Sequence, residues 1–164
     1  MQVPRRTPRS LSLGSLGLCM TTAQKRTFLS DVCYVLDQAR AFREYRRSGA
    51  EAFLAAHPFR QTLHNALLES SLSFLRKINE FFGKDADASV RAFFSDYPLS
   101  WLWAKTECDL INNRVMHLSL SHALEGDYDW AEFLDTHLPE AERRFGIFLE
   151  RLRREQPELF KTDA

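Results

Sequence analysis

Hydrophobic residues recur at steps of three and four along most of the chain, which is the spacing of one face of an α-helix. The first such stretch follows Thr22 and ends near Ser48-Gly49, where a glycine favours a helix stop. Its apolar positions are Phe28, Leu29, Val32, Cys33, Val35, Leu36, Ala39 and Phe42. Charged residues occupy the opposite side, so the pattern predicts an amphipathic helix of about six turns.

A second long helix is predicted to begin at Pro58, because proline is favoured at the first helical position, and to end at Gly83. A short helical turn over residues 50–56 precedes it. Another short helix, over residues 90–94, is expected to end before Tyr97-Pro98, since a residue before proline is disfavoured in a helix. Apolar residues cover more than half of the second helix in places, which indicates a central helix with neighbours on two sides.

Two further long helices are predicted in the second half of the chain. The first spans Leu99 to about Leu118, with Trp101, Leu102 and Ala104 among its inner residues. A connector over residues 119–129 and a short segment over 130–134 precede the last long helix, from Pro139 to about Arg154. The positions expected to be buried are Leu36, Leu67, Phe74, Ile78, Ile111, Phe145 and Phe148.

The fold class is therefore predicted to be all-α, a helical bundle of four long helices with short connecting helices. A chain of 164 residues is in the range of one domain, and we place that domain at residues 22–155, followed by a polar tail at 156–164. Residues 1–21 are expected to be a disordered extension, with Met20 as the functional start. A targeting peptide is the alternative, because Arg5, Arg6 and Arg9 precede the apolar residues 11–18.

Composition removes several functional classes. The 22 basic and 22 acidic residues balance, so net charge does not favour nucleic acid or membrane binding, and any such binding requires a local patch. No phosphate-binding loop, serine elbow, His-Glu-x-x-His or Glu-x-x-His signature occurs, and no apolar run approaches a membrane span. We predict no metal, cofactor or membrane partner, although His64, His117 and His122 could converge in a fold. Three widely spaced cysteines indicate reduced thiols and a cytoplasmic location.

One stretch is chemically unusual, at the end of the predicted third helix. Asn112, Asn113, Arg114 and His117 lie within six residues, and positions 113, 114 and 117 can share one helix face. The arginine could bind a phosphodiester while the imidazole exchanges a proton with a ribose hydroxyl or a leaving group. The alternative is a polar helix end whose side chains satisfy neighbouring backbone groups.

This stretch resembles the motif of HEPN domains of the abortive-infection and toxin type. His117 matches the motif histidine, and Asn113 matches the polar residue after the motif arginine, whose own place is taken by Asn112. The resemblance implies a helical bundle that binds RNA or a nucleotide, dimerises, and cleaves RNA without metal. Because an amide carries no fixed positive charge, the Asn112 departure implies weakened or lost catalysis.

Two arginine groups are candidate binding surfaces. Arg40, Arg43, Arg46 and Arg47 form a one-sided cluster, interrupted by Glu44 alone, and are the stronger candidates for nucleic-acid contact. The arginines of the last helix alternate with glutamates, which is typical of a solvated, ion-paired face.

The sequence thus predicts a HEPN-like RNA- or nucleotide-binding protein, a weak or inactive metal-independent ribonuclease of a defence or toxin system, acting as a homodimer. The alternative is a non-enzymatic helical protein that acts through self-association or a protein partner.

Overall fold

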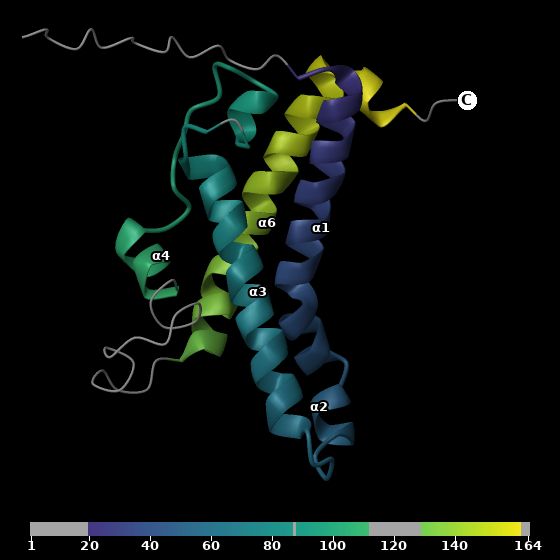
Figure 1. The fold of residues 1–164 in the computed structure, drawn as a ribbon, viewed down its shortest axis with the longest axis vertical. Coiled ribbons are helices and arrows are strands. Elements are labelled where there is room, and N and C mark those ends of the chain that lie inside the picture. Colours follow the sequence, from purple (N-terminus) through teal and green to yellow (C-terminus); the bar gives the residue numbers. More distant parts are fainter. Residues whose placement is uncertain (1–19, 87, 112–128, 162–164) are drawn as a thin grey trace, which may run out of the picture.

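The computed structural model describes residues 20–86, 88–111 and 129–161, and these residues form helices and connecting segments with no strand (Figure 1). The all-α prediction is confirmed. The helices are α1 (Thr22–Arg47), α2 (Ala50–Phe53), α3 (Arg60–Gly83), α4 (Lys105–Ile111) and α6 (Trp130–Glu155), with 3₁₀ turns η1 (Val90–Ala92) and η3 (Pro157–Phe160).

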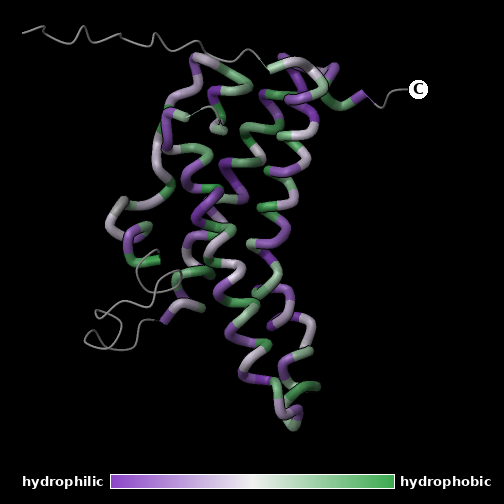
Figure 2. The backbone as a smooth tube through the Cα atoms, in the orientation of Figure 1, coloured by the Kyte–Doolittle hydropathy of each residue, from purple (hydrophilic) through white to green (hydrophobic). Residues whose placement is uncertain are grey.

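Three long helices lie side by side and form the body of the molecule (Figure 1). The helices α1 and α3 make an antiparallel hairpin, which α2 closes at the lower end of the picture. The helix α6 runs beside them in the direction of α3, so that the start of α1 and the end of α6 lie at the same end. Hydrophobic residues recur at regular intervals along all three helices (Figure 2), as the sequence pattern predicts.

The start of α1 has a reciprocal cap. The Thr21 hydroxyl accepts from the Gln24 amide at 3.2 Å, and the Thr21 amide donates to Oε1 of Gln24 at 2.9 Å. At the other end, Gly49 adopts a positive φ of 75°, a conformation that glycine tolerates without strain. The predicted first helix is confirmed. The next two elements are shorter than predicted, since α2 ends at Phe53 and α3 begins at Arg60 rather than Pro58.

The core is a layer of aromatic and aliphatic side chains between the three long helices. Phe148 of α6 is fully buried, and its ring lies 5.3 to 5.6 Å from the rings of Phe81, Phe93 and Phe145. Five of the seven positions expected to be buried are buried, namely Leu36, Ile78, Ile111, Phe145 and Phe148.

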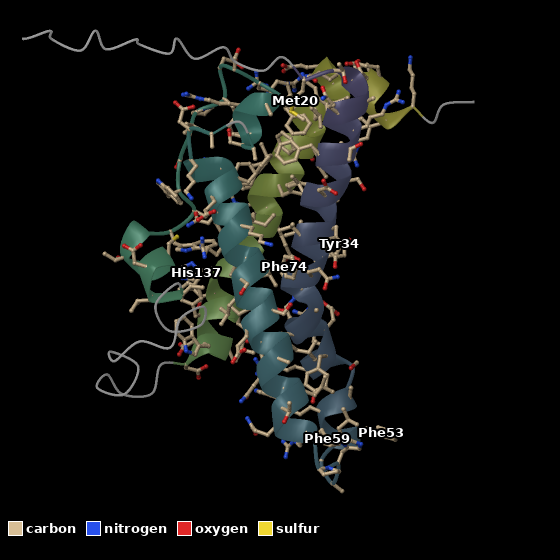
Figure 3. The ribbon with its side chains drawn as sticks, viewed as in Figure 1. Met20, Tyr34, Phe53, Phe59, Phe74 and His137 are labelled. Atoms are coloured by element: carbon tan, nitrogen blue, oxygen red, sulfur yellow. The ribbon has the colours of Figure 1, made fainter. Side chains whose placement is uncertain are left out.

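The expectation of full burial is wrong for Leu67 and Phe74, which are only partly buried. Phe74 lies at the outer edge of the contact between α1 and α3 (Figure 3). There it packs edge-to-face against the exposed ring of Tyr34 at 6.1 Å, and the Lys77 ammonium covers it at 4.7 Å. The ring of Phe74 is therefore covered by two surface side chains and not by a third helix.

The predicted start of the third long helix at Leu99 is wrong, because residues 99–104 are not helical and α4 begins at Lys105. Instead of starting a helix, two backbone amides of this segment donate hydrogen bonds to residues of α3. The Ser100 amide donates to the Phe82 carbonyl at 3.0 Å, and the Leu102 amide donates to Oδ1 of the buried Asn79 at 2.6 Å. The continuation to Leu118 lies outside the described residues, so three of the four predicted long helices are seen.

This extended segment also changes which residues are buried. Trp103 is buried, whereas Trp101, Leu102 and Ala104, expected inside, are exposed or half-buried. A Cβ at position 83 would collide with the indole ring of Trp101. Gly83 therefore ends α3 and also gives that ring room to lie against the helix.

The prediction of separate elements at 130–134 and 139–154 is wrong, because α6 is continuous and contains Pro139. A proline inside a helix removes a hydrogen bond and costs about 3 kcal/mol. One unbroken buried stripe offsets this cost and comprises Phe133, Leu134, Leu138, Ala141, Phe145, Phe148 and Leu152. The Asp129 carboxylate caps the start of α6 by accepting from the Glu132 amide at 2.8 Å.

The expectation of a polar tail after residue 155 is wrong for residues 156–161. Leu159 of η3 is buried, and Nε2 of Gln156 donates to the Phe93 carbonyl at 2.7 Å. From α1, Lys25 donates to Oε1 of Gln156 at 3.1 Å and Arg26 donates to the Glu158 carbonyl at 2.7 Å. The folded unit therefore extends past residue 155, while residues 1–19 and 162–164 lie outside the described residues.

Candidate nucleic-acid interface

The four candidate catalytic residues, Asn112, Asn113, Arg114 and His117, lie outside the described residues. Their predicted common face is therefore untested. The segment that holds them follows the buried Ile111 at the end of α4 and precedes the cap of α6. The helices on either side of the motif, α4 and α6, are in contact through Glu107 and His137.

A histidine and a glutamate meet at this contact. Nε2 of His137, from α6, lies 3.5 Å from Oε1 of Glu107, from α4 (Figure 3). The imidazole packs against Phe133 at 4.2 Å and Trp103 at 5.1 Å between ring centroids. Burial lowers the pKa of His137 below its usual 6.5, although Glu107 opposes this shift. At neutral pH the imidazole is therefore largely uncharged and can accept or donate a proton.

The sequence analysis missed this pair because it started the last long helix at Pro139, two residues after His137. Once α6 is continuous, Phe133 and His137 are four residues apart on the same face. That spacing is the one local signal for the contact, and nothing in the sequence indicates Glu107 as the partner.

Three arginines of the α1 cluster, Arg40, Arg43 and Arg46, pair with acidic residues of α6. Arg43 donates to both oxygens of Glu142, at 2.6 and 3.0 Å, and Nε of Arg40 donates to the same carboxylate at 2.7 Å. Burial by itself raises the pKa of Glu142, but hydrogen bonds from the two arginines outweigh it, and the pKa lies below its usual range. Arg46 pairs with Asp135 at 3.0 Å.

The cluster is therefore less one-sided than its sequence indicates, because acidic residues of α6 offset its charge. Arg47 is the most exposed of the four arginines, and its nearest carboxylate is that of Glu44, at 3.6 Å. An open groove of about 560 Å³ runs along this surface. It is lined by Arg43, Arg46, Arg47, Glu51, Asp135 and Pro139, and we call it the arginine groove.

Beyond the groove, at the end of the α1–α3 hairpin, three large apolar side chains are exposed. Phe53 is 89% exposed, Phe59 is 66% exposed and Leu63 is 40% exposed. We call these residues the aromatic tip, and its two phenylalanines lie at the lower end of the bundle in Figure 3. The sequence analysis did not single out Phe53 and Phe59, because one apolar residue in a four-residue helix or a connecting segment carries no periodic signal.

Three arginines of α6 are paired with acidic residues. Arg143 binds Glu140 at 2.6 Å, and Arg154 binds Glu155 at 2.9 Å. Arg151 binds Asp96 at 2.9 Å as well as Glu155. The interpretation of this helix as carrying a solvated, ion-paired face is confirmed for these residues.

No group of three or more potential metal ligands occurs within residues 20–86, 88–111 and 129–161. In the same residues, no helix is both long enough and apolar enough to span a membrane. Cys33 and Cys108 are free thiols, half-buried and buried respectively.

Comparison of the chain with protein-family models, curated proteins and solved structures finds no match. The HEPN resemblance therefore remains a prediction based on the motif residues.

Proposed function

We propose that this protein is a HEPN-like helical bundle that binds RNA or a nucleotide through the arginine groove. The observation that carries the proposal is the convergence of Arg43, Arg46 and Arg47 on one open groove of the surface. A guanidinium binds phosphate oxygens in the same forked geometry as a carboxylate. The described residues thus offer phosphate-binding groups in a space large enough for a nucleotide.

The acidic partners in the groove limit the affinity that we expect. Arg43 is held by Glu142, so its guanidinium has a structural role as well. Arg46 and Arg47 are exposed, and exposed ion pairs contribute little free energy. A phosphate can therefore replace their carboxylate partners at small cost, and binding should be modest and strongly dependent on salt.

In this proposal His117 is the general acid-base group of RNA cleavage, and Asn112, Asn113 and Arg114 contact the phosphodiester, as the HEPN resemblance implies. Binding in the arginine groove does not depend on that chemistry. The protein can bind RNA even where the missing motif arginine at Asn112 has removed cleavage.

The test compares two double variants by fluorescence anisotropy with a labelled single-stranded RNA over a series of salt concentrations. Arg46→Gln with Arg47→Gln should weaken binding and reduce the salt slope by about 1.4, because each lost phosphate contact removes about 0.7. Arg143→Gln with Arg154→Gln is the matched control, since these exposed arginines of α6 lie outside the groove. No RNA binding by the parent protein, or equal losses in both double variants, would contradict the proposal.

A second candidate function, self-association or binding of a protein partner, is favoured by an apolar groove between α1 and α3. This groove, of about 370 Å³, includes Phe28, Val35 and Phe81, and its charged lining residues are Asp31, Lys77, Glu80 and Lys84. The 58% exposed ring of Tyr34 packs against Phe74, which Lys77 of the groove lining covers. Acidic and basic side chains on a single patch can pair with their counterparts in a second copy across a two-fold axis.

Sedimentation over a range of protein concentrations tests this second candidate. A dimer that dissociates on Tyr34→Glu, but not on the exposed control substitution Phe160→Glu, would support the homodimer. A protein that is monomeric at all concentrations would contradict self-association through this groove.

A further inference from the structure

We propose that the aromatic tip is a stacking platform for the bases of single-stranded RNA. This inference rests on the proposed function and names its ligand: an unpaired strand rather than a duplex or a free phosphate. Phe53 and Phe59 supply two exposed rings, and the arginine groove supplies the phosphate contacts next to them.

The two rings are exposed to a degree that is unusual for phenylalanine. Phe53 and Phe59 are the most exposed large hydrophobic side chains of the described residues, at 89% and 66%. No other described ring lies against Phe53, and Phe59 is near His57 alone, at 5.8 Å between centroids. Both faces of Phe53 and much of Phe59 are therefore accessible to a planar ligand.

The backbone that carries these rings is well held. The Glu51 carboxylate of α2 lies 3.4 Å from both the Arg60 guanidinium and the His64 imidazole of α3. The His57 amide donates to the Leu54 carbonyl at 2.8 Å, and the Arg60 amide donates to the His57 carbonyl at 3.0 Å. A stacking surface needs such support, because ordering a mobile loop on binding would reduce affinity.

The charge around the tip matches a polyanion. Arg47 of α1 and Arg60 of α3 lie in the elements that flank the two rings, and Arg46 immediately precedes Arg47. Their carboxylate partners are Asp135, Glu44 and Glu51, in surface ion pairs that a phosphate can replace at small cost. A strand whose phosphates follow the groove would bring its next bases to the tip.

Single-stranded RNA fits this surface better than the other partners that exposed aromatic residues can bind. Stable protein interfaces bury about 800 Å² on each partner. The aromatic tip has only two rings and one leucine, which is too small a surface for such an interface. In duplex RNA the bases are paired and stacked on one another, so their faces are not free. Proteins that bind unpaired strands commonly combine aromatic side chains, which stack on bases, with basic side chains, which bind phosphates. Such surfaces have little sequence preference.

The test replaces the rings without removing apolar character. Phe53→Leu with Phe59→Leu keeps hydrophobic side chains at both positions but cannot stack a base. Each stacked base contributes about five-fold or more to affinity, so this double variant should bind oligouridine about 25-fold more weakly than the parent. Phe160→Leu is the control, because it removes an exposed ring from η3, at the end of the bundle opposite the tip (Figure 1).

The measurements are anisotropy titrations with a short labelled oligouridine and with an RNA duplex of equal charge, at one salt concentration. We expect the parent to prefer the single strand, and the double leucine variant to lose that preference while circular dichroism and melting temperature stay unchanged. If the double variant binds like the parent, the stacking inference is overturned and groove binding stands. If the parent binds no RNA, the proposed function fails first.

A second arm uses vesicles that contain anionic lipid. Cosedimentation of the parent with these vesicles, lost in a Phe53→Ala and Phe59→Ala protein that keeps full RNA affinity, would assign the tip to a membrane surface and overturn the inference. The absence of cosedimentation, together with loss of RNA affinity in the same alanine protein, supports it.

Discussion

Arg43 of α1 and Glu142 of α6 are joined by two parallel hydrogen bonds, with Nη1 3.0 Å from Oε2 and Nη2 2.6 Å from Oε1. Both side chains are largely buried, at 14% and 24% exposure. Arg40 donates to the same carboxylate from one turn earlier in α1. One glutamate therefore fixes the position of α6 relative to the face of α1 that carries the arginine groove.

The first prediction concerns this carboxylate. Glu142→Gln should lower the free energy of unfolding by about 2 kcal/mol, because two arginines lose a charged acceptor in a partly buried site. Glu140→Gln is the control, since its exposed pair with Arg143 lies within one helix and should contribute much less to stability. Urea denaturation at neutral pH measures both values, and equal losses would mean that burial does not strengthen the Glu142 pairs.

The pH dependence of the same variant gives an independent check. The pKa of Glu142 in the folded protein lies below its usual value, so its ionised form stabilises the fold. That contribution is fully present above the unfolded pKa, about 4.3, and is lost as pH falls through the folded pKa. The stability difference between the parent and Glu142→Gln should therefore shrink on acidification, and a constant difference would contradict this assignment.

The second prediction tests the aromatic core. Phe148→Ala should cost about 3 to 5 kcal/mol, because this fully buried ring lies against Phe81 of α3, Phe93 just after η1 and Phe145 of its own helix. The neighbouring Ile147 is 49% exposed, and Ile147→Ala should change stability by about 0.5 kcal/mol or less. Thermal and chemical denaturation of the two variants give the comparison. Similar costs at the two positions would contradict the described orientation of α6.

The third prediction concerns His137. Burial holds its pKa below 6.5 and Glu107 opposes the shift. An NMR titration of the His137 ring resonances should therefore give a pKa below 6.5, and this pKa should fall further in Glu107→Gln. The unfolded chain binds this proton at higher pH than the folded chain does. Stability should thus be full above about pH 6.5 and decrease as pH falls through the folded pKa. In His137→Gln this step should vanish, and an unchanged pH profile in that variant would contradict the assignment.

The fourth prediction concerns the motif outside the described residues. His117→Ala should abolish RNA cleavage by the protein and leave its helical circular dichroism unchanged, because the imidazole is the proposed general acid-base group. Arg114→Ala should mainly weaken RNA binding and its salt dependence. If His117→Ala instead loses about 1 to 3 kcal/mol of stability and the parent neither binds nor cleaves RNA, the histidine has a structural role.

The sequence by itself determined the helical class and much of the core. The periodic positions of α1 coincide with its buried stripe, and Leu36, Ile78 and Phe148 could be assigned to the core from spacing alone. Helix periodicity is a local property, because residues three and four apart share a face whatever they pack against. For the same reason the sequence identified the arginine-rich face of α1 and the motif around His117 as candidates.

The tertiary structure decided which groups meet. The Arg43 partner, Glu142, lies 99 residues away along the chain, and no local pattern indicates that it would offset the charge of the arginine cluster. Long-range contacts also decided that Trp103 rather than Trp101 is buried, because Asn79 and the Phe82 carbonyl hold residues 100–102 out of a helix. Burial of one continuous stripe kept α6 helical through Pro139 against the local preference of proline. The packing free energy summed over a whole helix is larger than the differences in helix propensity between single residues, and a sequence pattern reports mainly the latter.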